Sequence, residues 1–269
     1  MTKILQPNSA ESNKTFSARK GKVYLVGCGL GDVEQLTLKA YRIIREVKIV
    51  LYDNLITDEI LALIPAKTHK IYVGKQKNCH SISQERINTL IADYAGQGFS
   101  VARLKSGDPY IFGRGAEEAL YLTEQGYQVD VIAGISSSVA GPACAGIPPT
   151  ARGYASSFSV VSAHLKDSKF NTDWLPLLKV PNHTTVVLMG LSLAGAIRKV
   201  ALQTGVSKDF PVAIIANASR PEQQSIVTTL SGLAKAAKTV QAPAVIVFGD
   251  VVNLYGKLPR YQPQQTVII

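Results

Sequence analysis

The chain has 269 residues, 46% hydrophobic and 18% charged, which is typical of a folded globular protein and excludes a disordered or collagen-like chain. Its 29 Lys and Arg against 19 Asp and Glu leave a formal net charge of +10. This surplus predicts an anionic partner without choosing between nucleic acid, a membrane surface and an acidic small molecule. No run reaches the roughly 18 apolar residues that a membrane-spanning helix needs, so no membrane segment is expected.

The N-terminus and the cysteines bear on location. Residues 1–20 lack an apolar core followed by a cleavage site, so they predict a mobile basic arm rather than a secretory signal. Cys28, Cys79 and Cys144 form an odd set without C-x-x-C spacing, which argues against a disulfide framework. The four histidines are scattered, and no spacing resembles a metal site. We therefore expect a cytoplasmic protein without a bound metal.

Residues 21–135 alternate between short β-type runs and helical patterns. The apolar spacing over 36–47 is that of one helix face, and Ser81 with Gln84 forms a capping-box pattern before another helix. This rhythm predicts a mostly parallel sheet with helices on its faces. The expected strands are 23–26, 49–52, 71–73, 101–104 and 129–132, and the expected helices lie over 36–47, 84–94 and 116–125.

The residue composition and the pattern of apolar residues change after Ala133. Residues 134–156 are rich in Gly, Pro, Ala and Ser, which predicts a connection made of loop and short helix. The expected later strands are 157–162, 184–189, 212–215, 225–229 and 244–248, with helices near 193–202 and 233–238. The chain is therefore divided into an N-terminal α/β domain over 21–135, a C-terminal α/β domain over 136–258 and a peripheral tail over 259–269.

Three features suggest a binding site. The cluster Gly27-x-Gly29-x-Gly31 follows a strand and precedes a helix, which fits either a ligand-binding turn or merely a tight turn. Asp53 follows the second strand, where open α/β sheets place functional groups, although a helix cap or surface carboxylate fits equally well. The segment 103–115 combines a strand end, a Gly-Asp-Pro turn and a second Gly-rich turn. A strand end and two turns rarely need so many Gly, Asp and Pro residues for structural reasons alone.

Together the motifs resemble one family. The segments VGCGLGDVEQLTLKA (26–40), YDNL (52–55), RLKSGDPYIFGRGAEEA (103–119), AGISSS (133–138), GIPPTARG (146–153) and NASRPEQ (217–223) are similar to those of the uroporphyrinogen-III C-methyltransferases, in the tetrapyrrole methylase superfamily. The resemblance covers residues 21–252. It implies two α/β domains with the active-site cleft between them, and a homodimer.

The resemblance also implies an activity. It is the transfer of two methyl groups from S-adenosyl-L-methionine to C2 and C7 of uroporphyrinogen III, giving precorrin-2 by way of precorrin-1 and leaving S-adenosyl-L-homocysteine. The product would serve sirohaem, cobalamin or haem d1 biosynthesis, and the sequence does not choose among them. The substrate carries eight carboxylates, so the basic surplus is consistent with it.

Site roles follow from the same resemblance. Asp53 corresponds to the proton acceptor and Lys75 to the proton donor, while Arg152 would pair with a substrate carboxylate, to which its planar guanidinium is suited. Cofactor contacts are expected from Leu30, Ser106, Gly107, Asp108, Ile111, Ser136, Ser137, Met189, Ala218, Pro243 and Ala244.

The chain departs from the family pattern at several motif positions: Leu30 stands for Pro, Ser106 for Gly, Ala151 for His, Ala216 for Glu and Ala218 for Gly. Two other enzymes stay open: a precorrin C-methyltransferase of the same superfamily, and a dinucleotide-dependent oxidoreductase using the first glycine cluster. Nucleic-acid binding is not expected, because the sequence holds no helix-turn-helix, zinc finger or aromatic RNA-binding motif.

Overall fold

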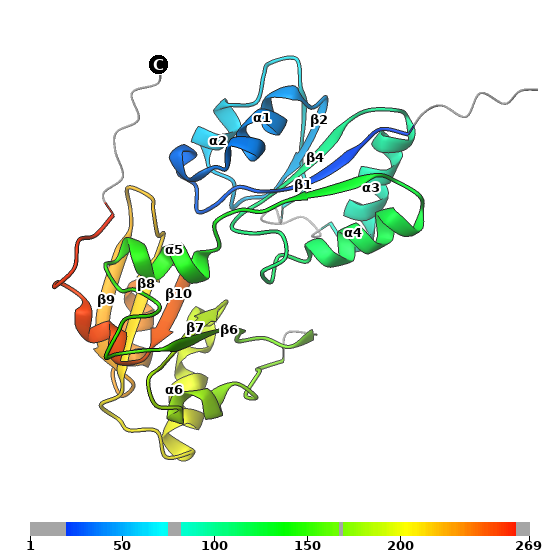
Figure 1. The fold of residues 1–269 in the computed structure, drawn as a ribbon. Coiled ribbons are helices and arrows are strands. Elements are labelled where there is room, and N and C mark those ends of the chain that lie inside the picture. Colours follow the sequence, from blue (N-terminus) through cyan, green and yellow to red (C-terminus); the bar gives the residue numbers. More distant parts are fainter. Residues whose placement is uncertain (1–19, 75–81, 167–168, 262–269) are drawn as a thin grey trace, which may run out of the picture.

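Two lobes, each built on a five-stranded sheet, make up the chain (Figure 1). The computed structural model describes residues 20–74, 82–166 and 169–261. The arm expected over 1–20 therefore lies outside the described residues except for Lys20, as do Lys75, Ser81 and the tail beyond Tyr261. The first sheet takes its strands from between Val23 and Ile132, and the second from between Ser157 and Phe248.

The first sheet is entirely parallel, with the order β3-β2-β4-β1-β5, which confirms the parallel sheet predicted from the alternating pattern. Strand β1 has a hydrogen-bonded neighbour on each of its two edges, β4 on one and β5 on the other. Its strands are β1 Val23–Gly27, β2 Ile49–Tyr52, β3 His69–Tyr72, β4 Val101–Lys105 and β5 Val129–Ile132.

Helices cover both faces of this sheet. Because side chains alternate along a strand, Val26 of β1 packs with the first two helices, and its neighbour Leu25 packs with the next two. The helices are α1 Leu38–Glu46, α2 Asp58–Ala62, α3 Gln84–Gly96 and α4 Gly115–Glu124. Two corrections arise: α2 was not predicted, and α3 is capped by Ser83, whose hydroxyl accepts from the Arg86 N–H, rather than by Ser81.

The second sheet is mixed, with the order β6-β7-β10-β8-β9. Only the β6–β7 pair is parallel, and the other three pairs are antiparallel. Its strands are β6 Ser157–Ser162, β7 His183–Leu188, β8 Pro211–Ala216, β9 Gln224–Thr229 and β10 Ala244–Phe248. The strand predicted to reach Met189 ends one residue earlier, because Met189 has a φ of 57°.

Two apolar layers cover the second sheet. On one face Val187, Ile214 and Phe248 pack against Ile197 and Leu233 of α6 and α7, and the other face packs with the segment after α5. The helices are α5 Ser137–Cys144, α6 Ala194–Gln203 and α7 Leu233–Ala236, and short 3-10 turns lie at Val33–Gln35, Leu175–Lys179, Leu191–Leu193, Ala237–Thr239 and Asp250–Leu254. No helix within the described ranges is long and apolar enough to cross a membrane.

The lobes also touch through side chains. Arg220 of the second lobe donates from Nε to the Leu30 carbonyl at 3.2 Å and from Nη2 to the Leu55 carbonyl at 3.0 Å. Near the end of the described chain, the Tyr261 hydroxyl donates to the Asp32 carboxylate. The first lobe's loops are therefore held by groups from the second.

Candidate active site

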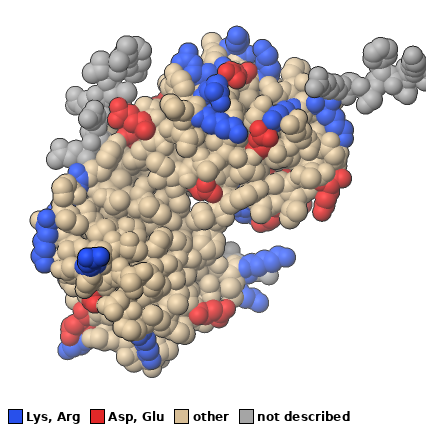
Figure 2. Space-filling model, in the orientation of Figure 1, with Lys and Arg blue, Asp and Glu red and all other residues tan. Residues whose placement is uncertain are grey.

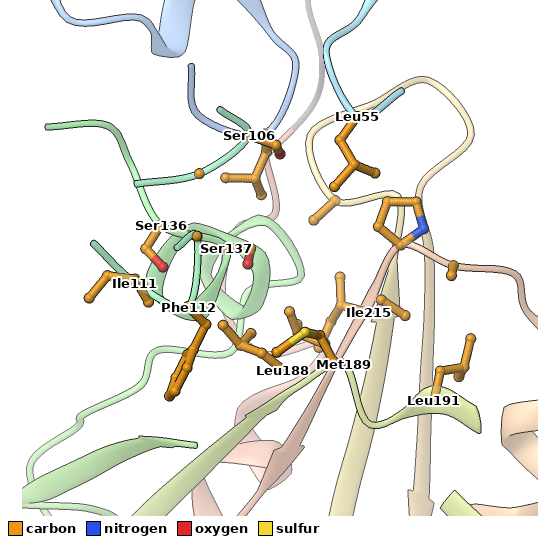
Figure 3. A pocket seen from close by; sticks show the side chains of 18 of the residues that line it. Leu55, Ser106, Ile111, Phe112, Ser136, Ser137, Leu188, Met189, Leu191 and Ile215 are labelled. Carbon is orange, nitrogen blue, oxygen red and sulfur yellow. The ribbon is translucent and has the colours of Figure 1, made fainter. Parts of the chain in front are cut away.

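A cavity of about 1200 Å³ lies between the lobes. The first lobe contributes the loops that follow β1, β2 and β4, and the second contributes the ends of β7, β8 and β10. Figure 3 shows Ser106, Ser136 and Ser137 on one side of this space and Met189, Leu191 and Ile215 on the other. The carboxyl ends of parallel strands are where open α/β sheets bind ligands, so the cavity has the expected position.

Gly27, Gly107 and Gly134 pack together where β1, β4 and β5 end, and Gly107 lines the cavity. A Cβ on Gly27 would lie 2.8 Å from the Gly107 carbonyl oxygen, and one on Gly134 would collide with the same oxygen. Gly107 has a φ of 71°, which L side chains rarely adopt. Its N–H donates to the Gly29 carbonyl at 2.7 Å. The motif glycines therefore let three backbones approach one another at the base of the cavity.

Four charged side chains form a buried cluster on the first lobe. The Arg103 Nη2 donates to Asp53 Oδ2 at 3.0 Å, and its Nε lies 3.4 Å from Glu118 Oε1. The Lys105 Nζ donates to Glu118 Oε2 at 2.9 Å. Asp53, Arg103 and Lys105 line the cavity, whereas Glu118 is fully buried behind them. The cluster brings two cations and two carboxylates into contact, so no charge in it is unpaired.

Burial acts unevenly on this cluster. Desolvation lowers the pKa of Lys105 below its ordinary value, while the Glu118 carboxylate beside it acts in the opposite direction. Outside the cluster, burial raises the pKa of the Cys28 thiol to about 12. Cys28 therefore stays a protonated thiol at neutral pH, and both it and Cys144 are free.

Polar groups beside the glycines brace the loops. Asp108 Oδ1 accepts from the Tyr110 N–H at 2.8 Å and Oδ2 accepts from the Gly134 N–H at 3.0 Å, which ties the loop after β4 to the loop after β5. The Ser136 side chain caps α5 by accepting from the Ser138 N–H. The α5 N-terminus therefore opens toward the cavity, since Ser136 and Ser137 both line it.

The wall from the second lobe is mostly aliphatic. Leu188, Met189, Ile215, Ala244 and Val245 line it, and Met189 is 49% exposed. Figure 3 shows Leu188, Met189 and Ile215 at this wall. Backbone conformations that non-glycine residues seldom adopt also gather around the cavity. Of the six such residues with positive φ in the described ranges, four line it: Phe112, Arg114, Met189 and Asn217. Such strain concentrates at functional sites.

The structure brings most of the predicted site residues into this one cavity. Its lining includes Leu30, Asp53, Ser106, Gly107, Asp108, Ile111, Ser136, Ser137, Met189, Ala218, Pro243 and Ala244. Arg152 does not line the cavity; it is exposed in the turn closed by the Ala151–Ala155 bridge. Lys75 lies outside the described residues. Among those described, no group of three or more His, Cys, Asp or Glu is placed to hold a metal.

The cluster behind Asp53 was not predicted from the sequence. Arg103 and Lys105 are two residues apart in a strand that is buried along its whole length, so both side chains point to the same face. Buried charges of one sign need counter-ions from the facing layer. The pattern Arg-x-Lys in a central strand therefore carried a usable signal for the cavity and for an acidic partner in α4.

Comparisons with known proteins identify the family. The chain matches the model of the tetrapyrrole (corrin/porphyrin) methylases over residues 22–234. It is 42% identical to the S-adenosyl-L-methionine-dependent uroporphyrinogen III methyltransferase of Methanosarcina barkeri over 244 residues, which are 89% of this chain and 95% of that protein. It is 41% identical to the siroheme synthase of Nitrosospira multiformis over 94% of this chain and 54% of that protein.

A solved structure agrees with these matches. The uroporphyrin-III C-methyltransferase of Thermus thermophilus, complexed with S-adenosylhomocysteine, superposes with a TM-score of 0.77 at 40% identity, covering 87% of this chain and 100% of that one. These similarities define a protein of the methylase class with the two-lobe α/β fold of that structure. The chain belongs to the tetrapyrrole methylase family. It spans about half the length of the siroheme synthases it matches.

Proposed function

We propose that the chain transfers methyl groups from S-adenosyl-L-methionine to C2 and C7 of uroporphyrinogen III, giving precorrin-2 by way of precorrin-1. The observation that carries this proposal is the single cavity that gathers twelve site residues expected from the resemblance, with Asp53 at its charged wall. The similarity to the Methanosarcina barkeri enzyme along almost its whole length supports the choice of substrate.

The cavity suits the methyl donor. Pockets for drug-sized ligands hold roughly 300–1,000 Å³, so about 1200 Å³ has room for a nucleoside cofactor beside part of a larger substrate. The aliphatic wall at Met189 and Ala244 would cover the adenine, and the backbone around Gly107 would lie against the polar end. When bound, the cofactor supplies an electrophilic methyl carbon on a sulfonium.

The residues of this chain would then position the reactants and move one proton. Methylation of a pyrrole carbon leaves a cationic ring that must lose a proton, and Asp53 is a carboxylate that lines the cavity and would accept it. The contacts between the lobes, such as those of Arg220 with the Leu30 and Leu55 carbonyls, would help to exclude water from the reacting atoms. Lys75 as the proton donor and Arg152 as a partner of a substrate carboxylate belong to the same proposal.

The charges at the cavity suit an octacarboxylate. Its lining carries two carboxylates, Asp53 and Asp108, and five cations: Arg103, Lys105, Arg114, Arg220 and Lys238. Arg103 and Lys105 are offset by Asp53 and Glu118, and Arg114 is offset by Glu117, so Arg220 and Lys238 are the cations that would add to the attraction. Figure 2 shows Lys and Arg, with some Asp and Glu among them, over the first lobe at the end away from the hollow between the lobes. A basic rim attracts a polyanion and weakens with added salt. A homodimer and a cytoplasmic location stay predictions.

The deciding experiment supplies uroporphyrinogen III and methyl-labelled S-adenosylmethionine and follows the product mass. We expect two added methyl groups, with one after short incubation. A single added methyl, or transfer only to an already methylated precorrin, would contradict the proposed reaction. Thermal shifts provide the control for the oxidoreductase alternative, since S-adenosylhomocysteine should raise the melting temperature and NAD(P) should not.

A further inference from the structure

We infer that Arg103, held in place by Glu118, is the positioning residue for the Asp53 carboxylate. This inference deepens the proposed function, because it concerns the group assigned there as proton acceptor. Arg103 begins the segment 103–119 that carries the resemblance, but it was given no role there, and it reaches the cavity from β4 in the middle of the sheet rather than from a loop.

Both oxygens of Asp53 are restrained, by different elements. Oδ1 accepts from the Leu55 N–H at 3.1 Å in the turn that follows β2, and Oδ2 accepts from Arg103 Nη2 at 3.0 Å. β2 and β4 are neighbours in register, with Leu51 beside Arg103, so the guanidinium reaches forward along the sheet to the end of β2. The turn alone would leave the carboxylate plane free to rotate, and the second bond orients it.

The guanidinium is itself fixed at three points. Nη1 donates to the Leu104 carbonyl at 2.8 Å, Nε faces Glu118 Oε1 at 3.4 Å, and only Nη2 is directed to Asp53. The Arg103 side chain is 6% exposed, so little space remains for another rotamer. A planar fork can make these bonds together, whereas a lysine at this position has one nitrogen to share among them.

Glu118 fixes the position of the Arg103 side chain. It is fully buried in α4, and its oxygens accept from Lys105 Nζ at 2.9 Å and from Gln84 Nε2 at 3.0 Å as well as facing Arg103. Gln84 also donates to Asn88 Oδ1 at 2.9 Å, which fixes the amide on α3. The position of Asp53 is thus set by two helices behind the sheet.

The test compares R103M and R103K with wild type, using R198M as the matched control. Arg198 donates to the Ser231 carbonyl at 2.9 Å and does not line the cavity. We expect kcat to fall about 100-fold in R103M and about tenfold in R103K, because displacement of a proton acceptor by about 1 Å costs that much. KM for the tetrapyrrole and affinity for S-adenosylhomocysteine should stay within about threefold. Equal losses in kcat and in cofactor affinity would overturn the inference.

A second measurement does not depend on turnover. Urea unfolding of wild type, D53N, R103M and the double variant forms a thermodynamic cycle. Each variant changes the unfolding equilibrium constant by some factor relative to wild type. We expect the factor for the double variant to be at least tenfold smaller than the product of the factors for the two single variants. Independent effects would overturn the inference. If wild type transfers no methyl to uroporphyrinogen III, the proposed function fails, and this cycle still decides whether Arg103 holds Asp53.

Discussion

The two walls of the cavity are built in different ways. The first lobe contributes a charged cluster whose members hold one another, with Glu118 buried and Asp53 at the surface of the cavity. The second lobe contributes aliphatic side chains, Leu188, Met189 and Ile215, and the turn of Pro243 and Ala244. The difference suggests a division of labour in which one wall handles protons and charge and the other holds an apolar part of the cofactor.

The largest effect should come from Asp53. We expect D53A to lower kcat about 10²–10⁴-fold, since that is what a general base contributes. Affinity for S-adenosylhomocysteine, measured by calorimetry, should not change because Asp53 is not among the expected cofactor contacts. Turnover equal to wild type would remove Asp53 from the chemistry, and a parallel loss of cofactor affinity would remove the division between the walls.

The next effect concerns stability of the charged wall. E118Q should lower the free energy of unfolding by about 3–5 kcal/mol in urea denaturation, because it leaves buried cations without their carboxylate. E117Q is the matched control, one residue earlier in α4. Glu117 pairs with Arg114 at the surface, where both side chains are more than half exposed, so its loss should cost at most about 0.5 kcal/mol. Similar costs for the two variants would show that burial does not set the value of these pairs.

The smallest effect tests the apolar wall. A244F should weaken S-adenosylhomocysteine binding at least tenfold, or about 1.4 kcal/mol, because the added ring fills space beside the adenine position. V227F supplies the control, since Val227 is 43% exposed on the edge strand β9 and does not line the cavity. An A244F enzyme with unchanged cofactor affinity would move the adenine to another part of the cavity.

The site residues that could be predicted from local sequence are those at the ends of strands. Gly27 ends β1, Asp53 directly follows β2 and Gly107 lies two residues after β4, so their place at the carboxyl ends of the first sheet follows from the alternating pattern alone. Met189 and Ala244 entered only through resemblance to the family, because nothing in their neighbourhood marks them as site residues.

What could not be predicted depends on contacts between distant segments. The pairing of Arg103 with Asp53 joins residues 50 positions apart, and that of Arg220 with Leu30 joins residues 190 apart. The mixed order of the second sheet was equally hidden, since strand lengths and apolar runs do not state which strands are neighbours. Arg152 shows the converse: a motif residue that the fold leaves outside the cavity lining.

The strand order also bears on how the protein is made. The first sheet draws all five strands from the stretch that ends at Ile132, and its last strand, β5, is added at an edge. In the second sheet β10 is the last strand along the chain yet lies between β7 and β8. During synthesis on the ribosome, the wall that carries the charged cluster can close early. The sheet of the opposite wall lacks its central strand, β10, until Phe248 has emerged. The cavity is therefore completed only near the end of translation.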